Sequence, residues 1–336
     1  MARIMVTGAS GYIGSVVVDH LLKENHQVLA VDWMIFGGLP LKPFHDNPNF
    51  ELLHQDIREI PVRTFRGVDM VCDLAGLPNE QCCALDPDLA REINVHARAR
   101  VARIAKAMGV KRLIALTSCE AYDVAEGETA DEHSPLRTNT VFMRSNQEFE
   151  TTLLAASAKD FSTTILRTGS VYGLSRRMRF DAMANVAALH AHMKRRFAVP
   201  GNPNCTLPFI HVRDVARAIT STFDAPLEEV SGRVFNLASQ SLSFAELMET
   251  AVDVLDKEME FDFVASTEVY PETDVSFEAL QAHTGFVPRI SVDQGMLEVF
   301  IALKGGRTEA TMATNTARFY RALIKQGSQS EVSRLT

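Results

Sequence analysis

The sequence lacks the features that place proteins in membranes or on nucleic acids. No apolar run approaches the roughly 20 residues that a membrane-spanning helix needs, and the residues after Met1 lack the charged, apolar and small-residue regions of a signal peptide. Lysine and arginine do not cluster, and the formal net charge is -8, whereas a surface that follows phosphates needs a concentrated excess of basic side chains. We therefore expect a cytoplasmic protein without membrane or nucleic-acid partners.

A metal site is not indicated either. The cysteines have no spacing typical of metal ligands, and they lie at positions 72, 82, 83, 119 and 205. His190 and His192 are two residues apart on a predicted helix, so their side chains would point to different faces rather than at one ion. An odd number of cysteines without such spacing is typical of a reducing compartment.

Strand-like runs alternate with helical patterns in the first half of the chain. Short β-branched runs predict strands at 4–6, 28–32, 50–54, 70–74, 113–118 and 163–167. Between the fourth and fifth runs, Asp86 and Pro87 predict the start of a helix and Gly109 its end. This alternation is typical of parallel βαβ units, so we predict an α/β fold with a doubly wound parallel sheet.

The second half of the chain is less regular, with a Pro-Gly-Asn-Pro loop at 200–203 and short strands separated by helices. We therefore expect a sheet domain at 1–173, to which later segments return, and a smaller lobe formed mainly by 174–325. This lobe would cover the open end of the sheet and bind the substrate. Residues 326–336 are predicted to form a flexible tail.

The first predicted strand leads into a glycine-rich turn that suits a dinucleotide. Gly8 allows a tight turn, Gly11 lets the backbone approach a pyrophosphate, and Gly14 allows close packing of helix and strand. The second strand ends in Asp32, at the distance where a carboxylate accepts both hydroxyls of the adenosine ribose and would repel a 2′-phosphate. These residues favour NAD over NADP.

Further motifs resemble those of the extended short-chain dehydrogenase/reductases, in particular the NAD-dependent epimerase/dehydratase group that modifies nucleotide sugars. The resemblance runs from the glycine turn to about Gly295. Besides the turn, it is carried by Asp56-Ile57, Leu74-Ala75-Gly76, Asn94, Thr117-Ser118, RTGSVYG at 167–173 and FIHVRDVA at 209–216.

The resemblance implies a Rossmann-type fold, a homodimer and a set of contacts to NAD. Asp56 and Ile57 would flank the adenine, and Val171 would lie beside the nicotinamide carboxamide. The full set of implied cofactor residues is Gly8, Ser10, Gly11, Tyr12, Ile13, Gly14, Asp32, Trp33, Asp56, Ile57, Leu74, Ala75, Gly76, Asn94 and Val171.

The sequence departs from the family at its acid/base pair. Members carry a Tyr-x-x-x-Lys motif on the helix after the fifth strand, where Lys lowers the pKa of the Tyr that moves a proton during hydride transfer. Here Phe142 replaces that Tyr and Asn146 replaces that Lys. Phe has no ionisable proton and Asn carries no charge, so an active enzyme needs another base.

Ser118, Cys119 and Glu120 are the candidate catalytic residues. Ser118 matches the hydroxyl that binds the reacting sugar oxygen in the family, and Glu120 matches a dehydratase glutamate that removes a proton next to a carbonyl. Cys119 could act as an acid if its pKa were shifted, but alternation along the strand end would point it away from Glu120. The alternatives are that Cys119 belongs to the core, that Glu120 is a hydrogen-bonded loop carboxylate, and that Tyr122, matching a structural tyrosine, supplies the phenol.

The substrate side combines matches with another departure. Arg176, Arg177, Arg179 and Asn185 lie where the family binds a nucleotide diphosphate, and arginine suits phosphate oxygens. Of these we assign Arg177, Arg179 and Asn185 to substrate binding. The alternative is that this segment is an exposed surface loop without a ligand. Leu207 occupies a position where the family commonly places a diphosphate-binding arginine, so one contact is missing. His211 matches a structural histidine.

Two hypotheses about function follow. The first is an NAD-dependent enzyme of the epimerase/dehydratase type, an oxidoreductase or lyase with atypical acid/base residues that acts on a nucleotide-activated sugar or a related polyhydroxylated metabolite. The second is an NAD(H)-binding regulatory or partner protein that has lost catalysis. Phe142 and Asn146 favour the second, whereas the cofactor motifs and Ser118-Cys119-Glu120 favour the first.

Overall fold

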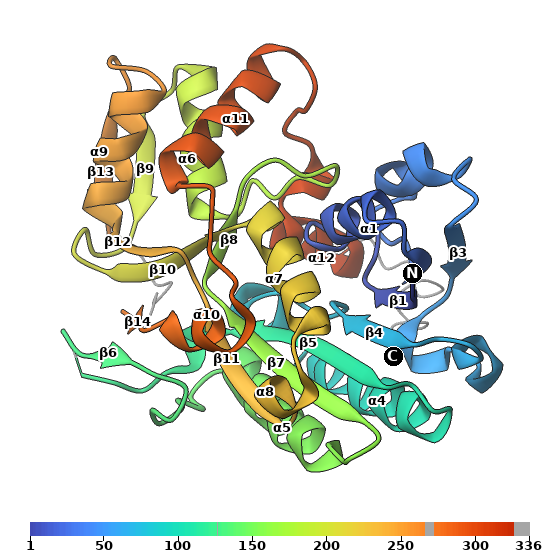
Figure 1. The fold of residues 1–336 in the computed structure, drawn as a ribbon. Coiled ribbons are helices and arrows are strands. Elements are labelled where there is room, and N and C mark those ends of the chain that lie inside the picture. The colour runs from blue at the N-terminus through green and yellow to red at the C-terminus, as the bar shows by residue number, and fades with distance from the viewer. Residues whose placement is uncertain (126, 266–271, 326–336) are drawn as a thin grey trace.

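A seven-stranded parallel sheet organises the chain, shown in the computed structural model of Figure 1, which describes residues 1–125, 127–265 and 272–325. In spatial order its strands are β11 (Arg233–Leu237), β7 (Ser162–Thr168), β5 (Arg112–Ser118), β4 (Met70–Asp73), β1 (Arg3–Thr7), β2 (Gln27–Asp32) and β3 (Phe50–His54). The chain leaves β1 in one direction towards β3 and in the other towards β11, which makes the sheet doubly wound. The predicted fold class is therefore confirmed.

The switch in direction between β1 and β4 fixes where a ligand can bind. At such a point the connections after two neighbouring strands leave towards opposite faces, and a crevice opens beyond the carboxyl ends of the strands. The six predicted strands are confirmed with small differences at their ends. The sequence analysis missed β11, which pairs with β7 from Arg233 to Leu237.

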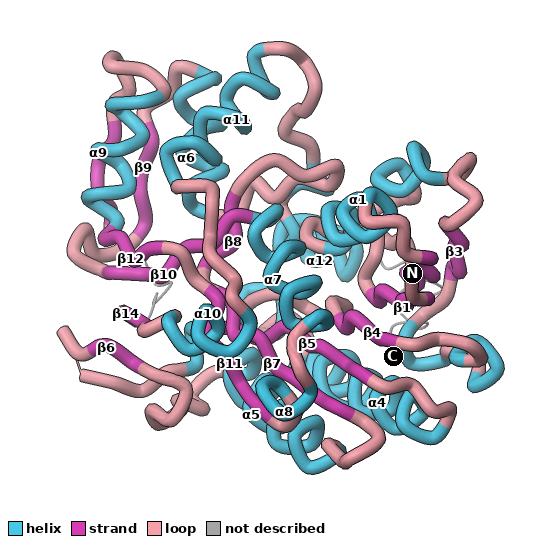
Figure 2. The backbone as a smooth tube through the Cα atoms, in the orientation of Figure 1, coloured by secondary structure: helices cyan, strands magenta, loops and turns pink. Residues whose placement is uncertain are grey.

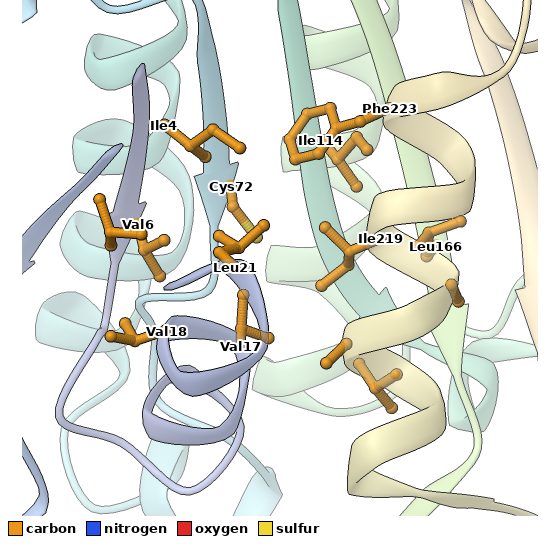
Figure 3. Close-up of a cluster of buried hydrophobic side chains, with 14 of the residues drawn as sticks. Ile4, Val6, Val17, Val18, Leu21, Cys72, Ile114, Leu166, Ile219 and Phe223 are labelled. Atoms are coloured by element: carbon orange, nitrogen blue, oxygen red, sulfur yellow. The ribbon is translucent and has the colours of Figure 1, made fainter. Parts of the chain in front are cut away.

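Helices cover both faces of the sheet (Figure 2). On one face, α1 (Gly14–Lys23) and α7 (Val212–Asp224) pack against the strands through a core that includes Val17, Leu21 and Ile219. Figure 3 shows these side chains directed towards Cys72 and Ile114 of the sheet. The other face is covered by α4 (Arg98–Ala107) and α5 (Val141–Ala156).

The predicted crossover helix begins as expected but is not uniform. The Asp86 side chain accepts a hydrogen bond from the Leu89 amide at 3.0 Å, and α3 runs over Pro87–Arg91. A π-helical segment, Glu92–Ala97, then separates α3 from α4, and the left-handed Gly109 (φ 81°) follows the end of α4. Such segments occur mostly at functional sites, and this one contains Asn94, which lines the cavity described below.

A smaller group of elements lies beyond the carboxyl edge of the sheet (Figure 1). It contains the strands β8 (Ser170–Tyr172), β9 (Phe197–Pro200), β10 (Thr206–His211), β12 (Gln240–Ser243) and β13 (Phe261–Val264), and the helices α6 (Met183–Met193), α9 (Phe244–Val254) and α11 (Val292–Lys304). The strands β6 (Thr129–Ala130) and β14 (Asp274–Val275) form a separate pair, and the helices α8 (Leu227–Val230) and α10 (Glu278–Thr284) contact the sheet strands β7 and β11. The division of the chain at residue 173 stays a prediction.

The last described element returns to the first half of the chain. Helix α12 (Thr316–Lys325) contacts the short helix α2 (Glu80–Cys83). Its Ala317 belongs to a buried cluster with Leu77 and Phe142. The predicted tail at 326–336 lies outside the described residues. No helix in the described part of the chain is long and apolar enough to cross a bilayer.

Candidate active site

The turn after β1 leaves no room for side chains at two of its glycines. Gly8 has a φ of 66°, and a Cβ on it would lie 2.9 Å from the backbone of Ala75. A Cβ on Gly14 would lie 2.0 Å from the Gly8 carbonyl oxygen. The turn therefore brings the amide groups at the start of α1 to the crevice between β1 and β4, where such groups bind phosphates.

Asp32 ends β2 beside this turn. Its carboxylate accepts hydrogen bonds from the backbone amides of Ser10 at 2.9 Å and Met34 at 2.5 Å. Burial raises the pKa of Asp32, although both amides favour its charged form. The Ser10 hydroxyl donates to the Gly37 carbonyl at 2.8 Å, which joins the turn to the loop after β2.

The residues implied for the adenine side lie at the ends of β2 and β3. Ile57 is buried and begins a short helical turn, and the Asp56 side chain caps that turn. The Asp56 carboxylate also pairs with Arg58 at 2.8 Å. The Trp33 carbonyl lies 2.8 Å from Nε2 of His54.

A cavity of about 530 Å³ lies at the carboxyl ends of β4 and β5. The residues that line it include Ile13, Leu74, Ala75, Gly76, Asn94 and Val171 from the set implied for NAD, and Ser118, Glu120, Phe142, Asn146 and Arg179 from the candidate catalytic and substrate residues. The structure therefore brings together residues from both sets. Cys119, Arg177 and Asn185 are not among the described residues that line this cavity.

Asn94 shapes one wall of the cavity through its side-chain amide. Its Oδ1 accepts a hydrogen bond from the Leu77 amide at 2.8 Å, and its Nδ2 donates to the Leu77 carbonyl at 3.1 Å. A Cβ on Gly76 would lie 3.0 Å from Asn94 Oδ1. The loop after β4 is thus held against the π-helical segment.

Ser118 and Glu120 lie together where β5 ends. The Ser118 hydroxyl accepts a hydrogen bond from the Glu120 amide at 3.2 Å, and both side chains border the cavity. Burial raises the pKa of the Glu120 carboxyl; Glu80 adds to this effect, and Arg179 opposes it. This carboxyl is therefore easier to protonate than an exposed glutamate, which suits a group that exchanges a proton.

Phe142 and Asn146 occupy the first turns of α5. The Thr140 side chain caps this helix through the Met143 amide, and Glu80 accepts a hydrogen bond from the Phe142 amide at 2.8 Å. Asn146 is 3% exposed, and its Nδ2 has no hydrogen-bond partner among the described residues. A buried donor without a partner is costly, so this amide on the cavity wall is suited to a ligand oxygen.

A buried polar network supports α5 and the end of β5. Arg167 and Glu150 form a buried ion pair at 2.6 Å, and Thr117 donates to Glu150 at 2.6 Å. The Tyr122 hydroxyl donates to Asn236 at 2.5 Å and accepts from Arg167 at 2.9 Å. Tyr122 is fully buried in this network, which is a structural environment.

Cys119 contacts the same network. Its thiol is fully buried and donates to the Arg167 carbonyl at 3.1 Å. Burial raises the pKa of this thiol well above its usual range. A thiol that holds its proton so firmly is a poor acid, and this environment resembles the core alternative of the sequence analysis.

The residues assigned to the substrate side have different environments. Arg179 borders the cavity and pairs with Asp181 at 2.9 Å. The Asn185 amide accepts from the Gly173 amide at 2.9 Å and donates to the Tyr12 hydroxyl and the Arg179 carbonyl, both at 3.0 Å. Arg177 stacks on Phe36 instead, with its Cζ 3.9 Å from the ring centroid. The role of all three in substrate binding stays a prediction.

Leu207 and His211 have the environments that the sequence suggests. Leu207 lines the cavity and supplies no charge there. His211 is fully buried, with Nδ1 accepting from the Arg213 amide at 3.1 Å and Nε2 2.7 Å from Glu298. Both ring nitrogens are therefore engaged within the protein.

Sequence reasoning missed two acidic residues on the cavity wall, Glu80 and Asp181. Neither belongs to a motif quoted above. The available signals were weak: Asn79 before Glu80 is a helix-capping residue, and Asp181 follows Arg179 by two positions. Both acids lie in loops or short helices, whose packing is set by contacts that are distant in sequence.

The site fits a dinucleotide without a 2′-phosphate. The glycine turn offers amides where a side chain would block a diphosphate. Asp32 offers a carboxylate for ribose hydroxyls, and Asn146 offers an unused donor in the adjoining cavity. Within the residues that the structure describes, no group of three His, Cys, Asp or Glu side chains is arranged to hold a metal ion.

Curated relatives cover most of the chain. UDP-glucuronic acid decarboxylase 2 from Arabidopsis thaliana is 25% identical over 333 residues, which cover 94% of this chain and 73% of the relative. dTDP-glucose 4,6-dehydratase from Streptomyces griseus is 24% identical over 305 residues, covering 88% of this chain and 92% of the relative.

A solved structure has a similar fold. It is a UDP-glucuronic acid 4-epimerase from Bacillus cereus, in a tyrosine-to-phenylalanine mutant form, in complex with UDP-4-deoxy-4-fluoro-glucuronic acid and NAD. It matches with a TM-score of 0.81 and 19% identity, covering 90% of this chain and 99% of its own. The profile of the NAD dependent epimerase/dehydratase family matches residues 4–238, so the chain belongs to that family.

Proposed function

We propose that this protein is an NAD-dependent enzyme that acts on a nucleotide sugar, with Glu120 as the group that moves a proton. The observation that carries the proposal is the position of the Glu120 carboxyl: it borders the same cavity as Ser118 and as residues 74–76, which belong to the set implied for NAD, and burial raises its pKa. Phe142 cannot exchange a proton, and Cys119 does not line the cavity, whereas Glu120 borders it beside Ser118.

Ser118 and Glu120, at the end of β5, have different roles in the proposed reaction. The Ser118 hydroxyl binds the reacting sugar oxygen by a hydrogen bond. NAD, when bound, supplies the acceptor and donor of a hydride. When a sugar hydroxyl is oxidised, its carbon would give a hydride to NAD and its oxygen would give its proton to the Glu120 carboxylate. After losing that proton to water, the carboxylate would take the proton from the carbon next to the new carbonyl and return it in a later step, as elimination or epimerisation requires.

The substrate class is supported by the family and by a guanidinium on the cavity wall. The relatives named above are named for UDP-glucuronic acid or dTDP-glucose. Arg179 brings a guanidinium to the cavity, and its pairing with Asp181 fixes the direction of the side chain. A fixed guanidinium suits the diphosphate or the carboxylate of such a substrate.

The proposal is tested with Glu120→Gln. The substrates are UDP-glucuronic acid, UDP-glucose and dTDP-glucose, and turnover is measured by product analysis and by reduced-nicotinamide absorbance. We expect turnover to fall about 10²- to 10⁴-fold and NAD affinity to stay unchanged. Because Glu120 must be ionised to act as a base, and its pKa is raised, kcat of the unaltered chain should rise with pH through that raised pKa. Glu92→Gln, in an exposed position, is the control and should leave both quantities unchanged.

A second candidate function is NAD(H) binding without catalysis. It is favoured by Phe142 and Asn146, which remove the acid/base pair of the family. The B. cereus epimerase mutant, in which phenylalanine replaces a tyrosine, was also solved with NAD. Tight NAD binding with no turnover of any of these pools, and no difference between the unaltered chain and Glu120→Gln, would replace the first proposal by this one. The homodimer and the cytoplasmic location stay predictions.

A further inference from the structure

Arg177 is a buried cation that lacks the partner which the other buried arginines have. Its side chain is 7% exposed, it forms no ion pair among the described residues, and its Nε has no hydrogen-bond partner there. By contrast, Arg98 pairs with Asp73 and Arg167 with Glu150, both at 2.6 Å. An unpaired buried charge costs several kcal/mol, so Arg177 is in an environment suited to an anion.

The guanidinium lies against the loop that follows Asp32. It stacks on Phe36, with its Cζ 3.9 Å from the ring centroid. Phe36 is adjacent to Gly37, whose carbonyl accepts the hydroxyl of Ser10 from the glycine turn. The positive charge of Arg177 also favours the charged form of Asp32.

The backbone of Arg177 is tied to the start of α1. Its amide donates to the Ser175 hydroxyl at 3.3 Å. That hydroxyl donates to the Tyr12 carbonyl at 2.6 Å and lies 3.1 Å from the Ser15 hydroxyl. The chain that carries Arg177 is therefore anchored at the helix N-terminus to which a dinucleotide presents its diphosphate.

Helix α12 supplies the remaining contacts around Arg177. Its Thr316 hydroxyl accepts a hydrogen bond from Arg177 Nη2 at 2.9 Å. Phe319 and Tyr320 contact the Phe36 ring, with centroids 4.8 and 5.7 Å away. These side chains fix Phe36 and Arg177 in place and exclude water from the guanidinium, which strengthens its attraction for an anion.

The pKa of Arg177 shows that its charged form lacks compensation by negative charge. Burial, together with the like charge of Arg179, lowers the pKa of Arg177 to about 10. The group is still protonated at neutral pH, so it keeps its charge in an environment that disfavours it. A bound anion would relieve that penalty.

We propose that Arg177 binds the diphosphate of the dinucleotide, as a cation that the second half of the chain supplies to the glycine turn. The inference rests on the NAD binding of the proposed function and adds a residue to it. The turn itself offers only neutral amides, whereas Arg177 offers a charged donor whose direction is fixed by Phe36 and Thr316. It also changes the expected role of Arg177, which the sequence assigns to the diphosphate of the substrate.

The test compares ligands with and without a diphosphate. Binding of ADP and of adenosine to the full chain is measured by calorimetry for the unaltered protein, Arg177→Gln and Arg177→Lys. We expect Arg177→Gln to weaken ADP binding about tenfold to a hundredfold, the range for a hydrogen bond to a charged group, and to leave adenosine binding unchanged. Arg177→Lys keeps the positive charge but loses the planar guanidinium, so its ADP affinity should lie between those of the unaltered protein and Arg177→Gln.

Arg103→Gln is the control, because Arg103 is an exposed arginine of α4 and its substitution removes the same charge away from the site. It should leave ADP binding unchanged. Equal ADP affinity in the unaltered chain and in Arg177→Gln, or an equal loss for ADP and adenosine, overturns the role of Arg177 while leaving NAD binding intact. Absence of ADP and NAD binding in the unaltered chain overturns the proposed function as well. If Arg177→Gln does not fold, the salt dependence of binding to the unaltered chain is measured instead. A steeper loss of affinity with salt for ADP than for adenosine supports the proposal, and an equal loss for the two ligands contradicts it.

Discussion

The two walls of the candidate site are built in different ways. The cofactor wall, which consists of the glycine turn after β1 and the adjoining loop after β4, is made largely of backbone: added atoms at Gly8 or Gly14 would collide with main-chain atoms. The reaction wall, at the end of β5 and the start of α5, is made of side chains: Ser118, Glu120, Phe142 and Asn146. Behind it lies the network of Glu150 and Arg167.

This difference explains which changes each wall can accept. A wall of backbone atoms has one geometry, so its residues are limited to those that leave space. A wall of side chains on a rigid support can exchange the groups that it presents while the support stays the same. Phe142 and Asn146, at the positions where the sequence resemblance implies a tyrosine and a lysine, lie on a helix whose Glu150 pairs with Arg167. The chemistry can therefore change without a change of fold.

The largest effect is expected from removing the support of the reaction wall. Glu150→Ala leaves Arg167 as a buried charge without its carboxylate, which typically costs 3–5 kcal/mol, and we expect a loss of about that size in the free energy of unfolding in urea. Glu148→Ala, two residues away, removes an exposed pair with Arg91 and should cost about 0–1 kcal/mol. Equal losses in the two variants would show that the buried pair does not hold this wall.

The next effect concerns the cofactor wall. Gly14→Ala places a Cβ 2.0 Å from the Gly8 carbonyl, so the turn must open. We expect NAD affinity, measured by calorimetry, to fall more than about 100-fold, which corresponds to about 2.7 kcal/mol. Gly109→Ala is the control: its φ of 81° makes alanine unfavourable by about 1–2 kcal/mol, but it should not alter NAD affinity. Unchanged binding in Gly14→Ala would mean that the turn is not the dinucleotide site.

A smaller effect is expected where the two walls meet. If the unused Nδ2 of Asn146 donates to the nicotinamide half of the cofactor, Asn146→Ala should weaken NAD binding about 2- to 10-fold, as for one neutral hydrogen bond. ADP lacks that half and serves as the internal control, so its affinity should stay constant. The same loss for ADP would indicate a structural effect of the substitution.

The arrangement of the glycine turn and Asp32 follows from the sequence more directly than that of the reaction wall, for a physical reason. Gly8, Gly14 and Asp32 act through local backbone geometry at the ends of consecutive strands, and their order in the chain is enough to place them. The same holds for the start of the crossover helix at Asp86. Its π-helical segment was not predictable, because the periodicity of apolar residues does not reveal one inserted residue.

Other features depend on contacts between distant segments. Arg177 is two residues from Arg179 in the sequence, yet one contacts Phe36 and Thr316 while the other borders the cavity. Burial raises the pKa of Glu120, and the charges of Arg179 and Glu80, from separate segments of the chain, lower and raise it further. The sequence predicted these residue types at the right end of the sheet, but neither their directions nor their partners.

The packing of α12 against Phe36 also has a consequence for how the protein is made. Phe36 emerges from the ribosome early and Phe319 late, and domains fold from the N-terminus as synthesis proceeds at about 5–20 residues per second. The glycine turn can therefore form while Thr316, Phe319 and Tyr320 are still to be translated. Phe36 and Arg177 would gain their contacts with this helix only once it has been translated.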